Sequence, residues 1–235
     1  MGDTGQTLNS LGQPIGCALP GFQPPPRPPR APLAGRWCRV EPLSATAHAA
    51  DLWDAYAEDV EGRVWTYLAS GPFRSDAESA ALVAAREPST DPLYFAIVDA
   101  ATGRAAGMAS YLRIEPAHGS IEVGHLAFAP RLQRTRAATE AMYLMMWQAF
   151  KLGYRRYEWK CDALNAPSRR AAERLGFRHE GTFRQAMVYK GRNRDTAWYS
   201  IIDSEWPSRA AAFEAWLDPM NFDAAGRQRR PLSGG

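Results

Sequence analysis

Apolar side chains recur along the chain at two spacings, one typical of helices and one typical of strands. Helical spacing covers residues 44–59 and 75–88, and each segment begins with a serine that can cap a helix N-terminus, Ser44 or Ser75. Alternating apolar and polar side chains predict strands at 35–43, 93–99, 105–116 and 120–130. Because short turns join the last three strands, an antiparallel meander is expected.

The second half of the chain alternates strands with helices. Broad apolar faces predict a helix over about 138–153, and an alternating segment predicts a strand at 155–163. A further helix is predicted at 166–176, because Gly176 is a helix-ending signal. A closing hairpin around the turn sequence GRN and a last helix at 207–218 complete the pattern.

This order of elements predicts one folded domain of the α/β (α+β) class. We expect a mixed, mostly antiparallel central sheet of about seven strands, with helices on both faces. Residues 1–34 are rich in Gly and Pro and predict an extended arm, which is either disordered or held on the domain by its few apolar side chains. The folded domain is predicted over 35–205, and residues 206–235 are predicted as a C-terminal helix with a polar tail.

Composition narrows the class of protein. Hydrophobic residues make up 46% of the 235 positions, which is ample for a packed core, and a net charge of +3 makes a nucleic-acid partner unlikely. Cys17, Cys38 and Cys161 are scattered and lack metal-ligand spacing, so we expect a reduced, cytoplasmic protein without a metal site. We also expect no membrane association, because no signal pattern and no apolar run of membrane-spanning length is visible.

A basic loop precedes the helix at 138–153. It reads QRTRAA, that is Gln133, Arg134, Thr135, Arg136, Ala137 and Ala138. A helix N-terminus offers unpaired backbone amides and partial positive charge, and arginine suits bidentate contact with phosphate. The residues alone therefore allow either a phosphate-binding loop or an exposed basic turn.

This loop and the segment NAPSRRAAERLGF (165–177) together resemble the GNAT acyl-CoA N-acyltransferases, over roughly residues 35–205. The resemblance is strongest to the branch that contains the ribosomal-protein N-terminal acetyltransferases. It implies a GNAT-like sheet and acetyl-CoA as co-substrate, with its pyrophosphate on the loop 133–138. It also implies that Asn165 binds the pantetheine region and that Ser168 lies near the sulfur. Arg136 departs from the family pattern, which has glycine at that position.

The resemblance also suggests catalytic roles. Many GNAT enzymes use a tyrosine seven residues after this asparagine, but here the position is Ala172, so Ser168 is expected to protonate the leaving thiolate. The backbone amides of Leu126 and Phe128 are the expected donors to the oxyanion. Met187 occupies the position that we align with the carboxylate base of the ribosomal-protein enzymes.

The resemblance therefore leaves the identity of the general base undecided. Glu122 and His125 are the main candidates, and strand alternation predicts that they lie on opposite faces, so that only one reaches the substrate. His179 and Glu180 are further candidates. Each of these side chains is equally compatible with a structural role.

The expected substrates are an acyl-CoA and an amine acceptor, and the aromatic segment 61–73 forms either a lid over that acceptor or ordinary core. Three alternatives remain: transfer of another acyl group such as succinyl, a catalytically silent CoA-binding module, and, weakest, RNA binding. A homodimer is possible through the closing hairpin or the Pro-rich arm.

Overall fold

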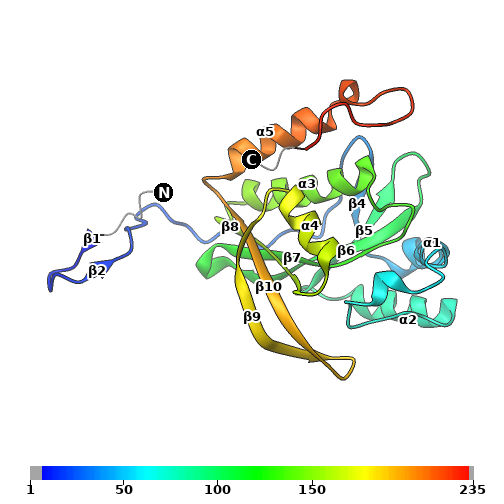
Figure 1. The fold of residues 1–235 in the computed structure, drawn as a ribbon, viewed down its shortest axis with the longest axis horizontal. Helices are drawn as coiled ribbons and strands as arrows, with labels where there is room; N and C mark the ends of the chain where they lie inside the picture. The colour runs from blue at the N-terminus through cyan, green and yellow to red at the C-terminus, as the bar shows by residue number, and fades with distance from the viewer. Residues whose placement is uncertain (1–6, 233–235) are drawn as a thin grey trace.

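The computed structural model describes residues 7–232, so the first six residues of the predicted arm and the last three of the predicted tail lie outside it. The described chain contains five α-helices: α1 (Ala45–Tyr56), α2 (Asp76–Arg86), α3 (Arg136–Lys151), α4 (Ala166–Arg174) and α5 (Trp206–Leu217) (Figure 1). Helix α3 begins two residues before the predicted start. The reason is Thr135, whose Oγ1 accepts a hydrogen bond from Ala138 N at 3.1 Å and caps the helix.

Eight strands of the described chain form one sheet in the order β3-β4-β5-β6-β7-β8-β10-β9. Their bounds are β3 (Leu33–Ala34), β4 (Cys38–Pro42), β5 (Leu93–Asp99), β6 (Ala105–Glu115), β7 (Ser120–Phe128), β8 (Arg156–Asp162), β9 (Arg178–Tyr189) and β10 (Arg192–Ile202). Every neighbouring pair is antiparallel except β7 and β8, which run parallel. The sheet has one strand more than expected, because the two-residue strand β3 is too short to show a pattern.

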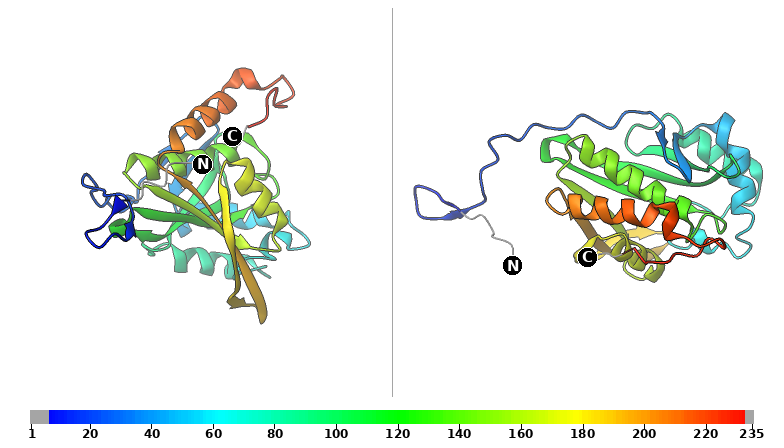
Figure 2. Two further views of the ribbon diagram at one scale, coloured as in Figure 1. Left: turned by 60° about the vertical axis from the view of Figure 1, so that its left-hand side comes forward. Right: turned by 90° about the horizontal axis from the view of Figure 1, so that it is seen from above.

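Helices cover both faces of the sheet, as predicted. On one face α1 and α2 pack on β5 and β6 through buried side chains that include Leu52, Val83 and Ala96. On the other face α3 and α5 lie side by side and bury Met145 and Phe213 with much of the sheet (Figure 2). The mixed, mostly antiparallel α/β architecture is therefore confirmed.

Both ends of the described chain lie outside the main sheet. The N-terminal arm carries a separate two-stranded pair, β1 (Thr7–Leu8) and β2 (Pro14–Ile15), that stands away from the domain (Figures 1 and 2). Nearer the domain Pro25 and Pro28 are buried. After α5 and the 3-10 turn η3 (Pro219–Asn221), the buried Asn221 side chain bonds the backbone of Trp216 and Arg230, so the chain folds back over α5.

Candidate active site

Strands β7 and β8 are paired along only part of their length. The parallel ladder runs from Ser120 opposite Arg156 to Val123 opposite Trp159 and then stops. Beyond it no strand of residues 7–232 lies along this edge of β7, so alternate backbone amides on that edge are open. The amides of Leu126 and Phe128, which the sequence suggested as oxyanion donors, belong to this unpaired part.

A cavity of about 200 Å³ lies where the two strands part. Because α3 follows β7 and α4 follows β8, both helices begin beyond this end of the strands. The cavity is lined by Tyr67, Leu68, Leu112, Arg113, Glu122 to Leu126, Trp159 to Asp162, Asn165, Ser168, Met187 and Arg194. The sequence-predicted residues Glu122, His125, Leu126, Asn165 and Ser168 are therefore brought together from β7 and from the N-terminus of α4.

Two strained residues line this cavity. His125 has a φ of 50° in a bulge of β7, and Arg113 has a φ of 45° in a bulge of β6. Left-handed backbone is uncommon for residues other than glycine and is concentrated at functional sites. The bulge at His125 adds a residue to β7 and breaks its alternation, so Glu122 and His125 line the same cavity. The prediction that they occupy opposite faces was wrong.

His125 is held as a neutral imidazole with one nitrogen open. The Ser110 hydroxyl donates to Gly124 O at 3.2 Å and lies 2.9 Å from His125 Nδ1. When the one hydrogen of the hydroxyl lies on Gly124 O, the Ser110 oxygen accepts from Nδ1–H, and this tautomer leaves the lone pair on Nε2. Burial, followed by the charges of Arg86 and Arg113, lowers the pKa of His125 to about 4. At neutral pH the ring is therefore unprotonated and carries a lone pair on Nε2, although the lowered pKa makes it a weaker base than an ordinary histidine.

Glu122 is engaged by two cations. Lys160 Nζ lies 2.9 Å and Arg113 Nε 2.7 Å from the same carboxylate oxygen, Oε2. The Lys160 side chain is only 2% exposed, and its ammonium also pairs with Glu158 at 2.7 Å. To act as a base Glu122 would have to give up these contacts, whereas His125 Nε2 has no such partner in residues 7–232. Of the two candidates, the geometry favours His125.

Ser168 and Asn165 are each fixed by one atom and open at another. Ser168 Oγ accepts a hydrogen bond from Trp159 Nε1 at 3.0 Å, so its own hydrogen remains available as a donor. Asn165 Oδ1 accepts from Ser168 N at 3.1 Å and caps α4, which leaves the Asn165 amide group to bind a ligand. Ala172 is fully buried, and no side chain from that position reaches the cavity.

The loop before α3 presents backbone amides. Gln133 Nε2 donates to Phe128 O at 2.8 Å, and Arg134 is left-handed with a φ of 62°. The backbone N–H groups of Arg134, Arg136 and Ala137 find no hydrogen-bond acceptor within residues 7–232. These amides, together with the helix dipole, suit an anion.

The Arg136 guanidinium is used differently from what the sequence suggested. It stacks 4.0 Å from the centroid of the Trp37 ring and 4.8 Å from that of Phe222. The side chain is thus held between two aromatic rings rather than left open to a phosphate. Only the backbone of Arg136 remains in the loop as a potential phosphate contact.

The aromatic segment 61–73 is partly core and partly a strap across the cavity. The Trp65 ring is 2% exposed and packs edge-on against Tyr56 and Phe73, each with a centroid distance of 4.8 Å. Tyr67 Oη then donates to Leu164 O at 3.2 Å, and Lys190 Nζ donates to Trp65 O at 2.8 Å. The segment is therefore tied to the start of α4 and to the tip of the closing hairpin.

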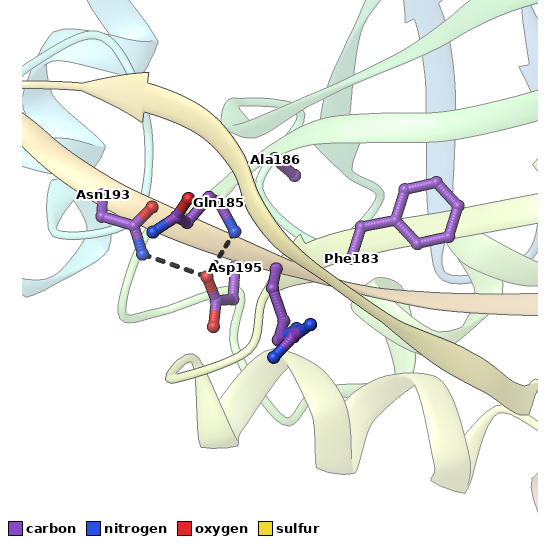
Figure 3. A pocket seen from close by; sticks show the side chains of 6 residues that line it. Phe183, Gln185, Ala186, Asn193 and Asp195 are labelled. Carbon is purple, nitrogen blue, oxygen red and sulfur yellow. Dashed lines mark hydrogen bonds between the residues drawn. The ribbon is translucent and has the colours of Figure 1, made fainter.

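The closing hairpin carries a bulge of its own. Its shallow, open hollow of about 750 Å³ surrounds Asp195, whose Oδ1 accepts hydrogen bonds from Gln185 N and Asn193 Nδ2 (Figure 3). Beyond the bulge, Met187 and Arg194 line the main cavity.

His179 and Glu180 lie outside the main cavity. The His179 ring packs on Tyr199, and Glu180 pairs with Arg156 and accepts a hydrogen bond from Ser200. Their contacts in this structure are structural. Neither side chain is among the residues that line the cavity.

The comparisons with known proteins agree with this geometry. The model of the acetyltransferase (GNAT) domain matches residues 39–178. The chain belongs to the GNAT acetyltransferase family. A GCN5-related N-acetyltransferase from Brucella melitensis has 48% sequence identity and a TM-score of 0.89, with 91% of this chain and 97% of that one covered. The GNAT resemblance noted from the sequence is thereby confirmed.

Two further relatives are more distant. The uncharacterized N-acetyltransferase YnaD of Bacillus subtilis (strain 168) is 30% identical over 86 residues, which are 36% of this chain and about half (50%) of YnaD. A ribosomal L7/L12 alpha-N-protein acetyltransferase, 20% identical with a TM-score of 0.61 over 72% of this chain and 91% of that one, shares the fold.

Four residues of the site were not predicted from the sequence: Arg113, Lys160 and Arg194, which line the cavity, and Ser110, which holds His125. They lie on β6, β8 and β10, and no motif marks them. Only a correct sheet order with its bulges would have placed them at the site. In residues 7–232 no group of three or more His, Cys, Asp or Glu side chains is arranged to hold a metal ion, and no helix is long and apolar enough to cross a membrane.

Proposed function

We propose that this GNAT protein is a cytoplasmic, acetyl-CoA-dependent N-acetyltransferase that acetylates a primary amine, either a protein N-terminus, a lysine or a small-molecule amine. The observation that carries the proposal is the pair of open polar atoms in one cavity. His125 Nε2, on β7, is an acceptor, and the Ser168 hydroxyl, on α4, is a donor. Acyl transfer from a thioester to an amine needs one group of each kind.

The residues present fit acetyl-CoA. The free amides of Arg134, Arg136 and Ala137 would hold the pyrophosphate, and the Asn165 amide would bind the pantetheine region. The open edge of β7 offers the Leu126 and Phe128 amides to the thioester oxygen. The bound co-substrate supplies an acyl carbon that is activated toward an amine.

The side chains then move protons at stated atoms. A primary amine is mostly protonated near neutral pH and must react in its neutral form. The neutral amine attacks the acyl carbon, its nitrogen gives a proton to His125 Nε2, and the carbon–sulfur bond breaks. The Ser168 hydroxyl passes a proton to the departing sulfur and recovers one from solvent, while His125 Nε2 releases the proton of the amine to solvent. The need for an acid is moderate because thiols have pKa values near 8.5. The strap at 61–73 covers the cavity and limits its access to water.

Calorimetry tests the proposal without knowledge of the acceptor. CoA and acetyl-CoA are titrated into the wild-type protein and into Asn165→Ser, which keeps a helix-capping oxygen but lacks the amide donor. We expect binding by the wild type and about tenfold weaker binding by the variant, which corresponds to about 1.4 kcal/mol. Asn193→Ser, on the closing hairpin, should bind like the wild type.

A screen of amines, followed by release of the free CoA thiol, then tests for transfer. Absence of binding by folded wild-type protein would overturn the proposal. Binding of acetyl-CoA without transfer to any amine of a broad panel would instead indicate a catalytically silent module.

A further inference from the structure

Arg194 is the one cation of the cavity lining that lacks a carboxylate partner within residues 7–232. Arg113 and Lys160, the other two cations of the lining, both pair with Glu122. Arg194 donates from Nε to Thr196 Oγ1 at 3.1 Å, and its guanidinium lies 5.9 Å from the centroid of the Tyr189 ring. Its two terminal nitrogens have no hydrogen-bond acceptor in the described chain. The Nε end of the guanidinium is therefore fixed, while its two terminal N–H groups are free to bind a ligand.

Asp162, the second carboxylate that lines the cavity, is engaged by groups other than Arg194. Asp162 Oδ1 accepts from Leu164 N at 2.8 Å, and Oδ2 accepts from Tyr189 Oη at 2.8 Å. No ion pair joins Asp162 to Arg194 in residues 7–232. Asp162 keeps its own negative charge, but the two terminal nitrogens of Arg194 stay unpaired, and two donors in a plane suit a carboxylate.

The position of Arg194 points to the acyl side of the site. Arg194 precedes by two residues Thr196, which pairs with Asp162, the neighbour of Cys161 on β8. Cys161, Ser168 and Arg194 all line the same cavity. Ser168 is the residue placed near the thioester sulfur in the proposed function, so Arg194 is within reach of a short chain that extends from the acyl carbon.

We propose that Arg194 binds a carboxylate at the far end of the acyl group, so that the enzyme takes dicarboxylic acyl-CoA donors of about succinyl size. This inference rests on the proposed function and extends its range of donors. The cavity volume of about 200 Å³ is large enough to contain a four-carbon acyl group. The reaction is otherwise unchanged: the amine nitrogen bonds to the acyl carbon, the carbon–sulfur bond breaks, and the distal carboxylate stays ionised throughout.

Three thioesters test the inference by calorimetry: succinyl-CoA, butyryl-CoA and acetyl-CoA. Butyryl has the same number of carbons as succinyl but no charge, so it controls for size. We expect the wild type to bind succinyl-CoA at least fivefold more tightly than butyryl-CoA, and Arg194→Gln to lose this difference while its affinity for acetyl-CoA stays within twofold. The matched control is Arg192→Gln, which removes the same charge from an exposed position on the same strand and should behave like the wild type.

The outcomes separate this inference from the function on which it rests. If the wild type binds acetyl-CoA but does not prefer succinyl-CoA over butyryl-CoA, the inference fails and the acetyltransferase proposal stands. If the preference exists but survives in Arg194→Gln, another group supplies it and the assignment to Arg194 is wrong. If no thioester binds, both proposals fail. Since the first comparison uses only the wild type, it remains decisive even if Arg194→Gln does not fold.

Discussion

The polar side chains of the candidate site share one design at the level of single atoms. Each is fixed by one hydrogen bond and keeps a second atom open: His125 by Ser110, Ser168 by Trp159, and Asn165 by the first turn of α4. A partner of this kind selects the tautomer or rotamer before substrate arrives, which lowers the cost of ordering these groups during the reaction. The open atom, rather than the residue type alone, indicates the chemistry.

Ser168→Ala tests the proposed proton donor. Without the hydroxyl we expect kcat to fall about 10- to 100-fold, at the low end for acid catalysis because a thiolate leaves readily, while KM for acetyl-CoA changes little. The buried Trp159 indole N–H also loses its acceptor, so the free energy of unfolding should drop by about 1–3 kcal/mol. Trp159→Phe is the control, because it removes the indole donor but keeps the serine. A kcat of Ser168→Ala equal to that of the wild type would rule out the acid role.

His125 should also control stability in acid. Its folded-state pKa of about 4 lies below the ordinary value of 6.5, so the unfolded chain binds a proton at a higher pH than the folded chain. Between these values the unfolded state holds more protons, and stability must therefore decrease as pH falls from 6.5 to 4. We expect His125→Asn, which tolerates left-handed backbone and does not titrate, to show a shallower decrease in urea midpoint over this interval. Parallel curves for the two proteins would contradict the lowered pKa.

Glu140 holds the chain at the entry to β4. Its carboxylate accepts hydrogen bonds from the backbone amides of Arg36, Trp37 and Cys38 at 2.9, 2.6 and 2.8 Å, and a side chain at Gly35 would overlap it. Glu140→Gln replaces one accepting oxygen by a donor that faces backbone N–H groups. We expect a loss of about 2 kcal/mol in the free energy of unfolding by urea titration. Glu115→Gln, at an exposed position, should change it by less than about 0.5 kcal/mol.

At the scale of elements, periodicity located the regular helices and strands but not their irregularities. Strand β5 was predicted at its observed bounds, because its apolar run ends at a turn on both sides. The bulges at Arg113 and His125 have no local signal, since a bulge depends on the register with the neighbouring strand. The same limit hid the position of Arg194, whereas the separation of β7 from its neighbour was implied by the family resemblance. The motif residues of the site were therefore predictable, while the residues that orient them were not.

The start of α3 gives a prediction at this scale. Because the Arg136 guanidinium is stacked on Trp37 and Phe222, Arg136→Ala should leave the affinity for CoA within about twofold of the wild type. The lost contacts should instead lower the free energy of unfolding by about 1–2 kcal/mol, at about 0.5–1 kcal/mol for each stacked ring. Calorimetry and urea titration of the same variant measure both quantities. A tenfold loss of CoA affinity without a loss of stability would instead indicate that the Arg136 guanidinium binds a phosphate of CoA.

For the whole molecule, the C-terminal segment belongs to the folded body, whereas the part of the N-terminal arm from Thr7 to Gly21 projects from it (Figure 1). Phe222 and Leu232 are buried, and Phe222 covers Arg136 at the start of α3. By contrast, the arm from Thr7 to Gly21 is exposed along almost its whole length. The two ends therefore differ in what they contribute: one completes the packing at the start of α3, while the other extends away from the domain (Figure 1).

The projecting part of the arm bears on the expected homodimer. Leu8, Leu11, Ile15 and Leu19 are 67%, 79%, 47% and 48% exposed, and no charged residue occurs between positions 4 and 26. The paired strands β1 and β2 are only two residues long, and so short a hairpin is marginal in water without a surface to cover it. A second copy of the chain would provide such a surface, as expected for an exchanged arm.

Deletion of residues 1–21 tests the dimer directly. We expect the full chain to have the mass of a dimer by light scattering and the deletion variant that of a monomer, because Phe22 and the buried prolines that follow still hold the remaining arm on the domain. A variant with Leu8, Leu11 and Ile15 all changed to Ser keeps the arm at full length and should also be monomeric. The active-site residues come from one chain, so CoA affinity should be unchanged in both variants. A monomeric full chain would exclude the exchanged arm. A dimeric deletion variant would indicate that the dimer forms through the closing hairpin instead.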